Sequence, residues 1–153
     1  MESLERLLAE HPFFAGLEPE HLAVLVGCAT NARFETGEFL CREGEPADNF
    51  YLIRHGCVSL EMFVPQKGPM RLQTLDPGDV VGWSWMVEPY TWRFDARAVE
   101  PVVAVSLDGV CLRTKCDADP RLGYELLKRF VEIMQQRLYS ARLGLLDVYG
   151  AGT

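Results

Sequence analysis

The chain has 153 residues, 48% of them hydrophobic and 24% charged, with a formal net charge of −7 and a pI near 5.0. This length and hydrophobic content are typical of one folded domain, residues 1–153, and exclude a disordered chain. An acidic surface does not attract nucleic-acid phosphates, and no apolar run approaches the roughly 18 residues of a membrane-spanning helix. We therefore expect a cytoplasmic protein, without a signal peptide, that binds neither nucleic acid nor membranes.

The side chains that most often hold metals or perform catalysis are scattered along the chain. The five cysteines include no Cys-x-x-Cys pair, and the three histidines lie at no ligand spacing from a cysteine or an acid. This pattern is that of reduced structural thiols rather than of a zinc, iron–sulfur or disulfide framework. No nucleophile stands at a recognisable spacing from a base, so we predict no metal site, no catalytic residues and no enzyme.

Three zones follow one another in chain order. Residues 1–30 are expected to be helical, since Leu22, Leu25 and Val26 follow Pro19 at helical spacing. Residues 32–112 are expected to form short strands between glycine turns; there, polar and apolar residues alternate with the two-residue period of a strand. Many short strands with Gly and Pro turns indicate a barrel or sandwich, so the predicted class is α+β, mainly β.

The third zone, residues 119–148, is predicted to be one long helix. Asp119 suits the N-cap and Pro120 the first helical position. A heptad seam runs along it with spacings of 4, 3, 4, 3 and 4 residues: Leu127, Val131, Met134, Leu138, Ala141 and Leu145. A second apolar edge lies beside the seam: Leu126, Phe130 and Ile133. One edge can rest on the barrel while the other meets a partner, so we predict a homodimer. The alternative is a monomeric helix with a wide buried stripe.

Residues 40–56 carry a recognisable signature. It has an apolar pair, a first glycine, a small residue, four consecutive apolar residues and a closing glycine: Leu40, Cys41, Gly44, Ala47, Phe50–Ile53 and Gly56. A turn of the form Leu-x-Pro-Gly-Asp follows at residues 75–79. In both motifs the chain resembles the cyclic-nucleotide-binding domain of the catabolite-activator and Fnr-type regulators. The resemblance implies an eight-stranded, jelly-roll-like β-roll with N-terminal helices and a long C-terminal dimerisation helix.

The second signature of that family is not matched. The resemblance implies a glutamate after Gly82, whose carboxylate accepts the ribose 2′-hydroxyl, but Trp83 stands there. Two residues further on, the family has a small residue that lets backbone amides approach the phosphate, and this chain has Trp85.

The arginine that pairs with the cyclic phosphate in the family is also displaced. If Ala96 and Ala98 point inward, Trp92 occupies the position of that arginine and Arg93 lies beside it. A shift of one residue would restore Arg93, but it would turn Asp95 and Arg97 into the core, at a large cost in burial. We therefore expect that cyclic AMP and cyclic GMP do not bind in the usual way.

Two interpretations of the tryptophans remain open. Their indoles can fill the vacated pocket as core, or they can stack on a planar ligand such as a purine or a nicotinamide while Arg93 or Arg97 meets its phosphate. In the second case the ligand is a nucleotide, either a cyclic nucleotide or of the NAD(P) type. The candidate pocket comprises Gly82, Trp83, Ser84, Trp85, Trp92 and Arg93.

We accordingly predict a non-catalytic regulatory or ligand-sensing domain. The alternative is an accessory subunit docked in a larger protein complex, because some stand-alone proteins similar to this one are small subunits of soluble NAD-linked hydrogenases. A DNA-binding regulator would need a helix-turn-helix, which the sequence does not contain.

Overall fold

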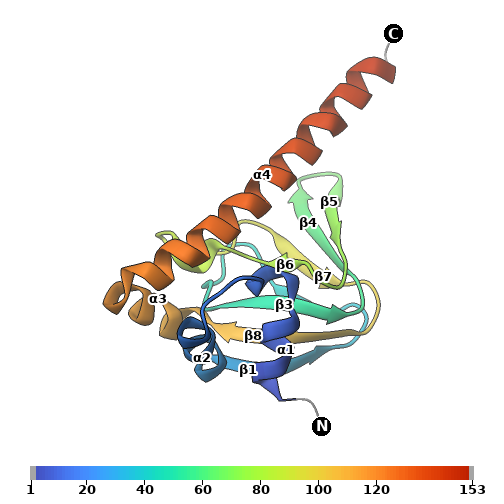
Figure 1. Ribbon diagram of the computed structural model, residues 1–153. Coiled ribbons are helices and arrows are strands. Elements are labelled where there is room, and N and C mark those ends of the chain that lie inside the picture. Colours follow the sequence, from blue (N-terminus) through green and yellow to red (C-terminus); the bar gives the residue numbers. More distant parts are fainter. Residues whose placement is uncertain (1–2, 152–153) are drawn as a thin grey trace.

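The computed structural model describes residues 3–151 and contains a β-roll with helical regions before and after it in the chain (Figure 1). The N-terminal region contains α1 (Leu4–Glu10), the 3-10 turn η1 (Pro12–Phe14) and α2 (Pro19–Gly27). The strands of the roll are β1 (Ala29–Phe34), β2 (Phe39–Cys41), β3 (Asn49–His55), β4 (Val58–Val64), β5 (Gly68–Leu75), β6 (Val80–Val81), β7 (Asp95–Ala98) and β8 (Val102–Asp108). The 3-10 turn η2 (Ser84–Met86) follows β6, and α3 (Gly109–Ala118) and α4 (Pro120–Ala151) follow β8.

The eight strands form two antiparallel sheets. One sheet has the order β1-β8-β3-β6 and the other the order β2-β7-β4-β5. This arrangement confirms the predicted class, which is mainly β with an eight-stranded roll and a long C-terminal helix.

Alternation along the strands sets the register of the roll, as the sequence pattern predicted. Ala96 and Ala98 on β7 are both fully buried and pair with Leu60 and Val58 on β4. Arg97, between the two alanines, points to the other face of the sheet. There its Nη2 donates to Oε2 of Glu61 at 2.8 Å. The shifted register, which would have placed Arg97 in the core, is therefore not the one that forms.

Two element boundaries differ from the predicted ones. The N-terminal helical region ends at Gly27, and residues 29 and 30 belong to β1, where they pair with β8. The last strand ends at Asp108, whose side chain accepts a hydrogen bond from the backbone N–H of Cys111 and so caps α3. The predicted β-roll zone extended to residue 112 and so overlapped the start of α3. This helix was not predicted, because the sequence Asp-Gly after a strand is also a common turn signal.

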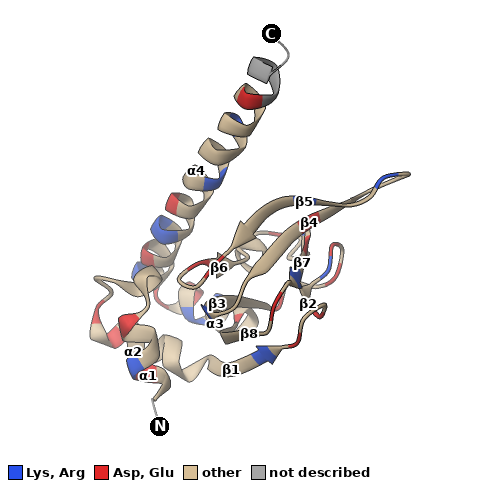
Figure 2. Cartoon of the chain, turned by 90° about the vertical axis from the view of Figure 1, so that its right-hand side faces the viewer, with Lys and Arg blue, Asp and Glu red and all other residues tan. Residues whose placement is uncertain are grey.

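Helix α4 begins where the sequence predicted, with Oδ1 of Asp119 accepting from the backbone N–H of Arg121 at 3.1 Å. Its first half covers the roll and buries Leu122, Leu126 and Phe130. Its second half projects beyond the strands, as two perpendicular views show (Figures 1 and 2).

Candidate functional site

The turn at residues 75–79 directs the chain towards the predicted pocket. Gly78 has a φ of +96°, and the Asp76 N–H donates to Oδ2 of Asp79 at 2.9 Å. The Gly78 N–H and the Asp79 carbonyl both bond to the backbone of Ile53 on β3, which holds the turn against the roll. The short strand β6 follows and ends at Val81, directly before Gly82. Residues 82–93 are called the cassette segment here. The hydrogen bonds of the preceding turn fix the position at which this segment leaves the roll.

Trp92 lies directly against Gly82. A Cβ atom on Gly82 would lie 2.2 Å from Cζ3 of the Trp92 ring, and Gly82 has a φ of +97°. Only glycine suits both the backbone conformation and this close approach. The indole is 5% exposed, and the backbone of Trp92 is held by Gly44 and Glu45 of the loop after β2. The Trp92 side chain therefore fills the space in front of Gly82.

Trp85 packs at the junction of the roll, α3 and α4. Its ring stacks on Phe50 with centroids 5.1 Å apart and an interplanar angle of 11°, and it meets Phe130 of α4 edge-on at 5.9 Å. The Trp85 carbonyl accepts a hydrogen bond from Arg113 of α3 at 2.7 Å. With 1% of its surface exposed, the Trp85 side chain is part of the core. Its Nε1 is buried and has no hydrogen-bond partner in the part of the chain that the structure describes.

Trp83 differs from the other two tryptophans because it is only partly buried and faces α4. The guanidinium carbon of Arg137 lies 5.0 Å from the centroid of the Trp83 ring. The same guanidinium donates through Nη2 to the carbonyl of Val80 on β6. Burial lowers the pKa of Arg137 to about 10, so the side chain still carries its charge at neutral pH. Trp83 and Arg137 thus connect the cassette segment to the long helix.

The remaining predicted pocket residues do not converge on Gly82. Ser84 is buried in η2, while Arg93 is exposed. Arg97 is bound to Glu61, and this hydrogen bond lowers the pKa of the Glu61 carboxyl. Arg137 was not among the predicted pocket residues. The available signal was its position on the apolar edge that faces the roll, four residues after Ile133, where a charged side chain is unusual.

The six seam residues share one face of α4 beside the edge that packs on the roll. Four of them are about half exposed in the isolated chain, namely Leu127, Val131, Leu138 and Leu145. Leu126 and Phe130 of the second edge are fully buried. The structure therefore separates the two edges: one is covered by the roll, and the other is open.

The described part of the chain offers no cluster of three or more His, Cys, Asp or Glu side chains suited to a metal ion. Among the same residues, no helix has the length and apolarity needed to cross a membrane.

The fold and both glycine motifs lead to one family. The sequence model of the cyclic nucleotide-binding domain matches residues 32–119, which include all of the roll from β2 to β8. The chain belongs to the cyclic nucleotide-binding domain family.

Members of known sequence and structure agree with this assignment. A CRP-like cAMP-activated global transcriptional regulator from Mycobacterium tuberculosis is 28% identical over 145 residues, which make up 95% of this chain and 63% of that protein. The chain thus spans less than two thirds of the length of this regulator. The crystal structure of a candidate cyclic nucleotide-binding protein from Geobacter metallireducens is 31% identical, with a TM-score of 0.78 over 90% of this chain and 99% of that one. A cyclic nucleotide-binding domain from Methylobacillus flagellatus shares the fold, with a TM-score of 0.77 at 20% identity over 95% of this chain and 82% of that one.

Proposed function

We propose that this protein is a non-catalytic regulatory module of its family in which the usual cyclic-nucleotide site is closed by its own side chain. The observation that carries the proposal is the Trp92 ring packed against Gly82, where a Cβ would lie 2.2 Å from the ring. A phosphate cannot occupy the same space as the indole.

The chemistry of the cassette segment supports the same conclusion. A site for a cyclic nucleotide needs one side chain that accepts a hydrogen bond from the ribose hydroxyl and another that donates hydrogen bonds to the phosphate. In the usual positions of these two side chains, this chain has Trp83 and Trp92. Arg93 is exposed and Arg97 is engaged by Glu61, so neither arginine faces Gly82 as a free donor. Removing one partner of a buried charge pair typically weakens binding by about 2–5 kcal/mol, or roughly 30- to 4,000-fold.

The open seam on α4 supports a second element of the proposal, which is assembly with a second copy of the chain. A heptad seam of exposed leucine and valine side chains suits a parallel two-stranded contact, because a partner helix of the same sequence presents matching side chains. A chain that assembles through α4 with its nucleotide site filled can also serve as a subunit of a larger complex, which is the alternative function.

Calorimetric titration with cyclic AMP and cyclic GMP tests the closed site. We expect no binding at 100 µM ligand, about 100 times the dissociation constant of a 1 µM site. The Mycobacterium tuberculosis regulator serves as a positive control under the same conditions. Sub-micromolar affinity of this chain for either ligand would disprove the closed site.

The Trp92→Ala variant provides the matched comparison. If Trp92 alone blocks the site, its removal opens space in front of Gly82 without restoring an acid or an arginine. We expect weak cyclic-nucleotide binding at most. A cyclic-nucleotide affinity in this variant equal to that of the positive control would show that the missing charged groups are not needed.

A further inference from the structure

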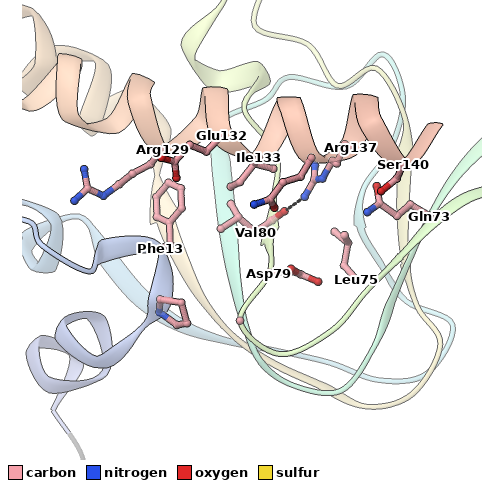
Figure 3. Close-up of a pocket in the computed structure, with 13 residues that line it drawn as sticks. Phe13, Gln73, Leu75, Asp79, Val80, Arg129, Glu132, Ile133, Arg137 and Ser140 are labelled. Carbon is pink, nitrogen blue, oxygen red and sulfur yellow. Dashed lines mark hydrogen bonds between the residues drawn. The ribbon is translucent and has the colours of Figure 1, made fainter. Parts of the chain in front are cut away.

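A cavity lies outside the cassette segment, between α4 and the end of the β5–β6 region (Figure 3). Its volume is about 320 Å³, at the lower end of the range of about 300–1,000 Å³ found for small-molecule sites. One wall is the face of α4 around Ile133 and Arg137, and the other is formed by Leu75, Asp79 and Val80. The cavity is therefore bounded by the two elements that Arg137 connects.

Arg137 is the unusual group in this cavity. A guanidinium has five N–H donors, and here Nη2 donates to the Val80 carbonyl while Nη1 is buried and finds no hydrogen-bond partner among the described residues. Among residues 3–151 Arg137 forms no ion pair. A buried charge without an anionic partner is costly, and a group that supplies an anion there would recover much of that cost.

The other charged side chains that line the cavity do not neutralise Arg137. Arg129 is engaged by Glu125 and by the carbonyl of Ala15. Glu132 and Asp79 are both exposed to solvent, and the attraction of Asp79 on Arg137 is outweighed by burial, which lowers the arginine pKa. Solvent screens the two carboxylates far more than the buried guanidinium. The positive charge therefore dominates at the inner wall of the cavity.

Two other polar side chains of the cavity have no partner. Gln73 of β5 and Ser140 of α4 both line it (Figure 3), and within the described residues neither side chain forms a hydrogen bond. An amide and a hydroxyl can each donate to a phosphate oxygen or bind a ligand hydroxyl. A few convergent polar groups around one cation are typical of a site for a small anionic molecule.

We propose that this cavity binds a small organic phosphate, with Arg137 as the residue that holds the phosphate. Arginine is suited to this role because its planar fork matches phosphate oxygens in a bidentate pair. The ligand enters the cavity and the guanidinium turns from the Val80 carbonyl towards it, which brings Nη1 into a hydrogen bond. The inference extends the proposed function, since it supplies a regulatory ligand site distinct from the closed one in front of Gly82.

Ligand binding at this site changes the surroundings of one tryptophan. Arg137 lies over the Trp83 ring, whereas Trp85 and Trp92 pack in the core away from that contact. Movement of the guanidinium therefore alters the fluorescence emission of Trp83. It also weakens the hydrogen bond that joins Arg137 of α4 to the Val80 carbonyl of β6. The same movement gives the ligand a way to act on the helix that carries the seam.

The test is a titration of tryptophan emission in a buffer free of phosphate and sulfate. The probes are inorganic phosphate, ribose 5-phosphate, AMP and adenosine. We expect saturable changes with the phosphate compounds, with dissociation constants below about 1 mM, and none with adenosine. Tighter binding of AMP than of ribose 5-phosphate would identify a nucleotide ligand, and equal binding would identify a sugar phosphate. A response to adenosine equal to that to AMP, or no response to any probe, would overturn the proposal.

Two arginine variants on the same helix provide the control. Arg137→Gln removes the charge and should weaken binding at least about 30-fold, whereas Arg142→Gln removes an exposed charge of α4 outside the cavity and should bind as the parent does. If Arg137→Gln unfolds, the variants Arg137→Lys and Ser140→Ala replace it. Circular dichroism checks that both are folded, and both should weaken binding. Unchanged affinity in the folded variants would overturn the role of Arg137. Because none of the probes is a cyclic nucleotide, this failure is distinct from tight cyclic AMP binding, which would disprove the closed site.

Discussion

The large apolar side chains of the cassette segment are mostly buried, whereas those along one face of helix α4 are exposed. In the cassette segment, Trp85 and Trp92 are turned inward and are almost fully covered by the roll, α3 and α4. On α4, a row of leucine and valine side chains is left open next to an edge on which Leu126 and Phe130 are fully buried. In the function proposed above, the first region closes the nucleotide site and the second provides a surface for a partner.

This difference indicates which part of the module carries its function. A buried aromatic cluster stabilises a fold whether or not a ligand is present, because the indoles supply the apolar contacts that a nucleotide base would otherwise make. The exposed seam does not stabilise the isolated chain in this way. Its side chains stabilise the protein only when a second helix covers them. We therefore propose that assembly, rather than cyclic-nucleotide binding, is the main property of this module.

The largest effect on stability is expected at Trp85. Trp85→Ala removes the ring that stacks on Phe50 and meets Phe130, and it leaves a cavity where the roll meets α4. We expect the free energy of unfolding to fall by about 3–5 kcal/mol, measured by urea denaturation at neutral pH.

Trp83→Ala is the matched control, because the Trp83 ring is partly exposed and its main contact is with Arg137. A loss of about 1 kcal/mol is expected there. If the two substitutions cost the same, the distinction between core and half-exposed tryptophans would not hold.

The next largest effect is expected in assembly. Met134→Lys and Leu138→Lys each place a charge in the seam and should raise the dimer dissociation constant at least about 100-fold, or roughly 3 kcal/mol. Sedimentation equilibrium measures this constant directly. Tyr139→Lys, an exposed position on the same helix but outside the seam, should leave it unchanged. A monomeric parent at high micromolar concentration would contradict the dimer.

Much of the fold could be predicted from the sequence, because its signals are local. The glycine turns, the inward alanines of β7 and the start of α4 at Asp119 each depend on a few neighbouring residues, and the structure places them as expected. The site could be predicted only in part. The contact of Trp92 with Gly82 depends on how the loop between them folds back, and that of Arg137 with Trp83 joins residues far apart in the chain; no spacing rule specifies either contact. Helix α3 was missed because its capping aspartate and glycine also form a common turn.

The contact between Gly82 and Trp92 can be tested by coupled substitution. Gly82→Ala adds a Cβ at a φ of +97° and against the indole, so the free energy of unfolding should fall by about 2–3 kcal/mol. In a Trp92→Leu background the collision is relieved, but the backbone strain remains. The same substitution should then cost about 1 kcal/mol less. Equal costs in both backgrounds, measured by urea denaturation, would show that the ring does not press on Gly82.

The smallest of these effects concerns the ion pair on the outer face of β4 and β7. Arg97 lowers the pKa of Glu61, so the stability that this pair contributes is fully present above the ordinary glutamate pKa of about 4.3 and is lost as the pH falls through the lowered value. Arg97→Leu leaves the buried Glu61 carboxylate without its partner. Because the Arg97 side chain is 36% exposed and therefore partly screened, the expected cost at pH 7 is only about 1–2 kcal/mol.

At pH 3 Glu61 becomes protonated in the variant, and the difference from the parent should shrink towards zero. Urea denaturation at both pH values measures it, with Glu61→Gln as the control that removes the charge but keeps the shape. A deficit of equal size at pH 7 and pH 3 would show that Arg97 contributes by packing rather than by its charge.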